Sequence, residues 1–267
     1  MLKALIIAVT VLTWNTARMD YTHKPDKNKV LHYLVSQDDD VICLQEVDVY
    51  KAERWLSLQD VRQALGGKYP YSYLDFAVYN KRHQFGTMVW SKYPIVNKHS
   101  IHYESKGNIS NRCDIIKGND TIRLLNNHLE SYSFTQEDIA EMDSKRNYEG
   151  FMASFKRVLA KWRRAIPIRN EQARVVRKEI DASPYPVIVV GDFNSIAWSY
   201  AFRHISEGLH DTWRELHPFQ WGATCEHRGI GVRIDYILCS DPLRPLYSTI
   251  PDAQGSDHKP LVTTIEW

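Results

Sequence analysis

Pro186-Val-Ile-Val-Val-Gly-Asp-Phe-Asn-Ser195 is the stretch of sequence that decides the fold. Its consecutive β-branched residues, 187–190, predict a strand that is buried on both faces. The strand ends at Gly191, and the polar residues Asp192 and Asn194 follow at its carboxyl end. Residues two apart on an extended chain point to the same side, and sites are usually built at this end of strands. A Gly-Asp turn followed by an Asx cap explains the same residues, so a structural and a catalytic role both stay open.

The composition is that of a soluble globular protein, with 43% hydrophobic and 25% charged residues in a chain of 267. This length suits one large α/β domain or two small ones, and without repeats or linkers we expect a single domain over residues 1–267. The net charge of +2 gives no global basic field that would favour nucleic acid. None of the 4 cysteines is in a C-x-x-C pair, so the sequence predicts no zinc site.

The amino-terminal residues 2–12 are almost wholly apolar and are similar to the core of a signal peptide. They are too short to span a membrane, and they run into Thr13-Trp-Asn15, which we assign to the first core strand. A sequence trimmed after an upstream membrane anchor or signal segment would begin this way. So would a cytoplasmic protein with a long first strand. We therefore expect a cytoplasmic protein if the chain is complete, and a membrane-anchored or exported one if it is trimmed.

The apolar patterns along the rest of the chain predict an alternation of strands and helices. The strands are expected over residues 9–14, 41–46, 71–78, 86–91, 111–117, 121–127, 187–190, 232–239 and 261–265, and the helices from Pro25, over 52–65 and over 135–181. Pro167 should break or kink the last helical region. The dense positive charge of that region, which includes Arg169, favours a solvated helix face over a phosphate-binding face.

Polar residues recur where the buried strands end. They are Asn15, Glu46, Asn127-His128, Asp192 with Asn194, Asp235 inside a late strand, and Ser256-Asp-His258 just before the last strand. Each has an ordinary explanation when taken alone, such as a turn cap, a surface ion pair or a core histidine with its hydrogen bonds made. The repetition of one pattern at the ends of so many strands predicts a functional site.

The motifs Thr13-Trp-Asn15, Gln45-Glu-Val47, Asn127-His-Leu-Glu-Ser131, Gly191-Asp-Phe-Asn194, Arg233-Ile-Asp-Tyr236 and Ser256-Asp-His258 span nearly the whole chain. In this order they resemble the endonuclease/exonuclease/phosphatase (deoxyribonuclease I-like) superfamily, and bacterial members of it in particular. That superfamily includes deoxyribonuclease I, abasic-site endonucleases, neutral sphingomyelinases and inositol-phosphate 5-phosphatases. The resemblance implies an α/β (α+β) fold, a four-layer α/β/β/α sandwich in which two mostly antiparallel sheets lie face to face with helices outside.

The resemblance also implies a divalent metal, Mg²⁺, for which Mn²⁺ would substitute. Mg²⁺ prefers oxygen ligands, keeps several waters and often takes only one or two carboxylates. Glu46 would be the main ligand, with Asn15 and Asp257 nearby, directly or through water.

The catalytic roles implied by the resemblance belong to hydrolysis of a phosphate ester. Asp192, helped by Asn194, would orient or deprotonate the attacking water. His128 and His258 would donate to phosphoryl oxygens, where negative charge is held in the transition state. Asp235 would accept a hydrogen bond from His258 and fix its tautomer.

The substrate stays open at this point, because one catalytic core serves several substrate classes. We favour a phosphodiester, in nucleic acid or in a phospholipid-like headgroup, over a sugar- or inositol-phosphate monoester, and a non-catalytic binding module is the remaining alternative. Arg112 and Trp198 are candidate substrate contacts, each with a structural role as the alternative. Residues 132–165 form a longer segment than the fold needs and would be a lid or a substrate-selecting wall, or its amphipathic stripe would face a membrane or pack on the core, with packing as the default. We expect a monomer without an obligate protein partner.

Overall fold

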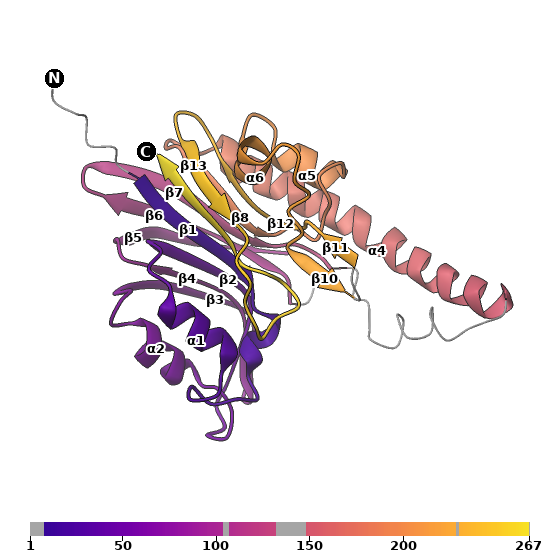
Figure 1. Ribbon diagram of the computed structural model, residues 1–267, viewed down its shortest axis with the longest axis horizontal. Helices are drawn as coiled ribbons and strands as arrows, with labels where there is room; N and C mark the ends of the chain where they lie inside the picture. The colour runs from indigo at the N-terminus through magenta and orange to yellow at the C-terminus, as the bar shows by residue number, and fades with distance from the viewer. Residues whose placement is uncertain (1–7, 104–106, 132–147, 228–229, 267) are drawn as a thin grey trace.

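Two six-stranded β-sheets lie face to face, and helices cover the outer face of each sheet (Figure 1). The computed structural model describes residues 8–103, 107–131, 148–227 and 230–266. In spatial order, the first sheet consists of β13 (Arg244–Thr249), β14 (Leu261–Glu266), β1 (Ala8–Asn15), β2 (Val41–Tyr50), β4 (His83–Ser91) and β3 (Tyr71–Tyr79). The second consists of β5 (Ile95–His102), β6 (Ile109–Lys117), β7 (Asp120–His128), β8 (Val187–Asp192), β12 (Asp235–Cys239) and β9 (His210–Asp211).

Most neighbouring strands in both sheets are antiparallel. The exceptions are the parallel pairs β1 with β2 in the first sheet and β7 with β8 in the second. The predicted fold class, a four-layer sandwich of two mostly antiparallel sheets, is therefore confirmed. The two parallel pairs matter for function, because they bring the carboxyl ends of four strands to the same end of the sandwich.

The helices divide between the two outer faces. Against the first sheet lie α1 (Lys29–Ser36) and α2 (Leu58–Leu65), and against the second lie α4 (Tyr148–Asp181) and α5 (Tyr200–Ile205). The remaining elements are η1 (Ala17–Asp20), α6 (Thr212–Leu216) and the hairpin of β10 (Cys225–His227) with β11 (Ile230–Val232). No helix in the described part of the chain combines the length and the apolar run that crossing a bilayer requires.

Alternation along the strands decides which side chains enter the core between the sheets. In β1, Val9 and Val11 face the second sheet, whereas Leu12 and Trp14 face the helices on the outer side. Asn15 shares the inner face with Val9 and Val11, because it follows them at even spacing. The same alternation places Asp192 with Ile188 and Val190 on the inner face of β8. The strand ends therefore present their polar groups to one another across the gap between the sheets.

Two helices begin later than their sequence patterns predict. Pro25 lies in a turn, and α1 begins at Lys29 because the side chain of Asn28 caps it, accepting a hydrogen bond from the Leu31 amide at 2.8 Å. Similarly, α2 begins at Leu58 after a capping box formed by Ser57 and Asp60. In both cases a side-chain cap near the first apolar turn sets the start, rather than the proline or the first residue with helical spacing.

Of the two predicted effects of Pro167, a break or a kink, the structure contradicts the break. Pro167 lies inside α4, which continues to Asp181. The carboxyl-terminal half of this helix buries Ala173 and Val176 against the second sheet, and that packing offsets the backbone hydrogen bond that a proline removes. Of the longer segment predicted to form a lid or wall, residues 132–147 lie outside the described residues.

Candidate active site

Seven side chains of the predicted site come together at one end of the sandwich. They come from the ends of β1, β7 and β8, from the bulge inside β2, from the start of β12 and from the loop before β14: Asn15, Glu46, His128, Asp192, Asn194, Asp235 and His258. Hydrogen bonds or close charge contacts join each of them to at least one other member. The two sheets contribute on opposite sides, so the site exists only once both sheets are assembled.

Glu46 reaches this site because β2 contains a bulge. The pairing of β2 with β4 shifts between Leu44 and Val47, and Glu46 adopts a left-handed backbone with φ of 50°. As a result, Gln45 and Glu46 both face the second sheet. Gln45 donates to Asn126 Oδ1 at 2.6 Å, and Glu46 Oε1 lies 3.5 Å from His128 Nε2. A regular strand would have turned Glu46 outward with Leu44.

Gly191 allows Asp192 to sit beside β7. Its φ is 124°, and a Cβ atom built there would lie 2.0 Å from the carbonyl oxygen of Asn127. Only glycine tolerates both the backbone angle and the close approach. In the resulting register, Asp192 pairs with His128 on β7 and with Asp235 on β12.

Asn15 connects the two sheets through its amide group. Its Nδ2 donates to Glu46 Oε1 at 3.1 Å and to Asp192 Oδ2 at 2.9 Å. Its Oδ1 accepts from the amide of Ala17 at 3.0 Å. The nitrogen rather than the oxygen therefore faces the carboxylates, so in this arrangement Asn15 positions the two acids.

Asp192 is a buried carboxylate whose two oxygens are both fixed. Oδ1 accepts from the Asn194 amide at 2.7 Å, and Oδ2 accepts from Asn194 Nδ2 at 3.1 Å as well as from Asn15. Burial and the nearby carboxylate of Asp235 raise the pKa of Asp192 to about 6, despite the opposing effect of His258 and His128. Asp192 is thus set to exchange a proton close to neutral pH.

His258 and Asp235 form a buried pair. The Nδ1 of His258 lies 2.8 Å from Asp235 Oδ2, so it donates to this carboxylate and leaves Nε2 as the other ring nitrogen. Burial lowers the pKa of His258, but Asp235 and Asp192 raise it, and the result lies well above the ordinary value. The raised pKa favours the imidazolium form, which can donate a proton from Nε2.

His128 is buried, and neither of its ring nitrogens makes a hydrogen bond within the described residues. At 3.5 Å, its contact with Glu46 is a charge contact rather than a hydrogen bond. Burial lowers the pKa of His128, whereas Glu46 and Asp192 raise it, and the net direction is upward. A buried polar ring without hydrogen-bond partners is costly, and an incoming phosphoryl oxygen would supply one.

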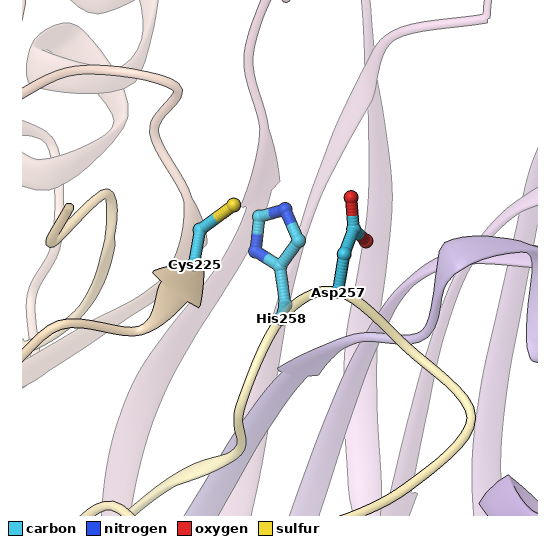
Figure 2. Close-up of side chains that lie close together, drawn as sticks. All are labelled: Cys225, Asp257 and His258. Carbon is cyan, nitrogen blue, oxygen red and sulfur yellow. The ribbon is translucent and has the colours of Figure 1, made fainter. Parts of the chain in front are cut away.

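Asp257 precedes the buried His258 and is itself exposed. Its carboxylate, the His258 imidazole and the Cys225 thiol approach one another closely, and their ligand atoms all lie within 4.8 Å (Figure 2). The sequence predicts Asp257 near the metal, but it gives no indication that a cysteine lies here.

A cleft of about 400 Å³ opens beside Glu46 and His128. One wall carries two basic residues whose side chains contact the buried carboxylate of Asp48. Arg18 donates to Asp48 Oδ2 at 2.6 Å, and His83 Nδ1 lies 2.7 Å from Asp48 Oδ1. Sequence reasoning missed all three of these residues. The one available signal was a second acid, Asp48, two residues after Glu46.

The structure does not bring the two predicted substrate contacts to this cleft. Arg112 points to the outer face of the second sheet, where its Nε donates to Glu179 of α4 at 2.6 Å. Trp198 is 63% exposed, and its ring centroid lies 5.8 Å from that of Trp221. Neither is among the described residues that line the cleft.

Arg169 differs from its predicted place on a solvated helix face. Its side chain is buried, Nε donates to the carbonyl of Glu130 at 2.8 Å, and Nη1 donates to the carbonyl of Asn194 and to Ser195 Oγ. It therefore ties α4 to the loop that carries Asn194. Helical spacing could not reveal this, because the acceptors belong to segments distant in the sequence and two of them are backbone carbonyls.

The sequence over residues 12–258 matches the Endonuclease/Exonuclease/phosphatase family. The chain belongs to this family. A search of curated proteins found no similar sequence. The activities in the family's name are all hydrolyses of phosphate esters, so the resemblance stated from the motifs is confirmed, as is the general class of phosphoester hydrolase.

Solved structures of similar fold cover almost the whole chain. An endonuclease/exonuclease/phosphatase from Beutenbergia cavernae DSM 12333 has a TM-score of 0.71 and 16% identity, over 97% of this chain and 71% of that one. D. rerio TDP2 complexed with single strand DNA product has a TM-score of 0.67 and 16% identity, over 97% and 99%. The human Nocturnin catalytic domain with bound sulfate anion has a TM-score of 0.65 and 16% identity, over 98% and 96%. At these identities the likeness shows the fold.

Members of this family generally depend on a divalent metal, typically Mg²⁺. The residues present fit such a cation. Glu46 and Asp192 lie on either side of Asn15, which donates to both, and oxygen ligands of this kind suit Mg²⁺. Burial raises the pKa of Glu46, but His128 and Asn15 lower it to about 2, so this carboxylate is ionised at neutral pH. Its side chain is 29% exposed and open to the cleft.

Proposed function

We propose that the protein hydrolyses a phosphodiester with the help of Mg²⁺, by attack of water on phosphorus. The observation that carries this proposal is the convergence of one buried carboxylate, Asp192, with two raised-pKa imidazoles, His128 and His258. Such a set supplies a proton acceptor for water and proton donors for the phosphoryl group within one water-excluding site.

Asp192 has the role of proton acceptor. Hydrogen bonds from Asn15 and Asn194 fix both of its oxygens, so it orients a water without first rearranging. With a pKa of about 6, Asp192 is mostly ionised at neutral pH and is a stronger base than an ordinary carboxylate.

His258 and His128 have the role of donors to the phosphoryl oxygens. Asp235 fixes the tautomer of His258, so its Nε2 carries the proton that is donated. His128 has no competing hydrogen bond within the described residues. Glu46, oriented by Asn15, would hold the metal, which when bound neutralises phosphate charge and stabilises the leaving oxygen.

The cleft favours a diester over a monoester. A diester carries a second substituent on phosphorus, and the space of about 400 Å³ beside Glu46 and His128 can accept one. Its wall offers Arg18 and His83 for a polar or anionic part and Val78 and Phe85 for an apolar part. One neighbour in fold, D. rerio TDP2, was solved with a single strand DNA product. We therefore place a nucleic acid first among the diesters and a phospholipid-like headgroup second.

The test is hydrolysis of bis-p-nitrophenyl phosphate and of p-nitrophenyl phosphate, with Mg²⁺, with Mn²⁺ and with a chelator. We expect metal-dependent cleavage of the diester, lowered about 10²- to 10⁴-fold by Asp192→Ala because the proton acceptor is lost. Asp252→Ala is the matched control, since this carboxylate is 91% exposed and lies outside the site. Circular dichroism would verify that both variants fold.

The outcomes separate the candidates. A wild-type rate in Asp192→Ala would contradict the assigned mechanism. Cleavage of the monoester alone would indicate a phosphatase. Comparison of single-stranded DNA, RNA and sphingomyelin would then rank the diester substrates.

A further inference from the structure

Cys225 and His258 stand directly opposite each other on two antiparallel segments. The backbone forms an isolated bridge between them, flanked by hydrogen bonds from the Lys259 amide to the Thr224 carbonyl at 2.6 Å and from the Glu226 amide to the Asp257 carbonyl at 3.1 Å. This is the narrow, non-hydrogen-bonded kind of pair, in which facing side chains come closest. The backbone pairing therefore brings the thiol and the imidazole close to each other, so their proximity does not depend on side-chain rotamers alone.

Asp257 completes a group of three potential ligands. The sulfur of Cys225, a nitrogen of His258 and a carboxylate oxygen of Asp257 all lie within 4.8 Å of one another, and Figure 2 shows the imidazole between the other two side chains. Because Nδ1 of His258 donates to Asp235, the nitrogen left for a cation is Nε2. A carboxylate behind the ligating imidazole is the usual outer support of a metal-bound histidine.

The chemistry of this donor set differs from that of the catalytic cation. Mg²⁺ takes oxygen ligands, whereas thiolate together with imidazole selects Zn²⁺. Zinc bonds of about 2.0–2.3 Å separate tetrahedral ligand atoms by about 3.5 Å, which small rotations of the exposed Asp257 and half-buried Cys225 side chains would reach. Three protein ligands leave the fourth position for water.

We propose that Cys225, Asp257 and His258 form an inhibitory site for Zn²⁺. On binding, the Cys225 thiol and His258 Nε2 each release a proton to solvent, and the sulfur and Nε2 then each give a lone pair to the metal. The inhibitory part rests on the proposed function, because Nε2 is the atom that donates to the phosphoryl group there. A zinc ion on Nε2 removes that proton, so zinc stops the reaction while Mg²⁺ is still present.

The binding test uses Co²⁺ as a coloured substitute for Zn²⁺, and it does not depend on activity. A cobalt–thiolate bond gives a charge-transfer band in the near ultraviolet. We expect the band in the wild type, its loss in Cys225→Ser, and its displacement by Zn²⁺. The other cysteines, Cys43, Cys113 and Cys239, are buried in the core and stay present in the variant, so they serve as an internal control.

The same titration in Asp257→Asn should weaken cobalt binding about 10-fold or more. Asp252→Asn is its control, because this neighbouring acid is 91% exposed and is not one of the three ligands. No band in the wild type, or an equal band in Cys225→Ser, would overturn the proposed site whether or not the protein proves to be a phosphodiesterase.

The inhibition test compares wild type and Cys225→Ser in excess Mg²⁺. We expect the two to have similar rates without zinc, and the Zn²⁺ concentration for half inhibition to rise about 10- to 100-fold in the variant. Equal sensitivity to zinc would overturn the inhibitory role. Equal thermal unfolding midpoints would show that the substitution leaves the fold intact.

Discussion

Two histidine–aspartate pairs of similar geometry lie in different surroundings in this molecule. In the group of seven converging site residues (the buried cluster), His258 Nδ1 lies 2.8 Å from Asp235. In the cleft, His83 Nδ1 lies 2.7 Å from Asp48. Both carboxylates are fully buried. The histidines differ, because the side chain of His258 is 9% exposed and that of His83 is 26% exposed.

The surroundings give each pair its role. His258 is buried and interacts with the carboxylate of Asp192, in surroundings where charge interactions are strong and a proton donor is most effective. His83 stacks on Tyr50 and borders an open cleft together with Arg18, which donates to the same Asp48. We infer that burial makes the first pair part of the chemistry and that exposure makes the second pair part of substrate recognition.

Asp235→Asn should have the largest effect on catalysis of the substitutions that separate the two pairs. It removes the charge that stabilises the His258 imidazolium, so kcat should fall about 10²- to 10⁴-fold. Asp48→Asn is the matched change in the other pair and should act mainly on KM. Steady-state kinetics of both variants on the same diester would measure the contrast. Equal losses of kcat in the two would remove the distinction between chemistry and recognition.

The pH dependence of the rate gives a second test of the role of Asp235. His258 must be protonated to donate, so the rate falls as pH rises through its pKa, which Asp235 raises. Without Asp235 that pKa falls, and the alkaline limb of the kcat/KM profile should move to lower pH. The acid limb belongs to Asp192, which must be ionised to accept a proton and whose pKa is about 6. A nuclear magnetic resonance titration of the His258 ring would check the alkaline shift directly, and Asp48→Asn should leave it unchanged.

Strand periodicity was enough to predict much of this site. The apolar runs before Asn15, His128 and Asp192 fix the strands, and alternation fixes which side each polar residue faces. Glu46 is different, because alternation alone places it outward with Leu44. Its inward position depends on a bulge with a left-handed residue that is not glycine. The motif resemblance indicated its role where the periodicity could not.

Strand periodicity could not predict the cleft, nor the contact between Cys225 and His258. Arg18 follows the first strand in a turn with left-handed backbone, and only the tertiary fold brings it to Asp48. Cys225 and His258 belong to segments far apart in sequence that meet through one isolated bridge. No local spacing encodes such contacts, since they arise from the packing of loops on the finished sandwich.

Arg18→Gln should have a moderate effect, confined to substrate binding. Loss of a charged donor in the cleft should lower kcat/KM about 10- to 100-fold through KM, with kcat nearly unchanged. Arg82→Gln is the control, because Arg82 is exposed beside His83 but is not among the described residues that line the cleft. A fall in kcat without a change in KM would contradict the recognition role. A normal unfolding midpoint would exclude damage from leaving Asp48 with one partner fewer.

Arg112→Gln should have the smallest effect on activity, because Arg112 belongs to neither pair. Its ion pair with Glu179 lies between the second sheet and α4, outside both the buried cluster and the cleft. We expect unchanged kcat and KM and a loss of about 1 kcal/mol or less in the free energy of unfolding, as for a partly exposed ion pair. Urea denaturation of Arg112→Gln, Glu179→Gln and the double variant would measure the coupling between the two residues. If Arg112→Gln instead raised KM, the substrate would have to extend across the outer face of the second sheet, and the cleft beside Glu46 would not be the whole recognition surface.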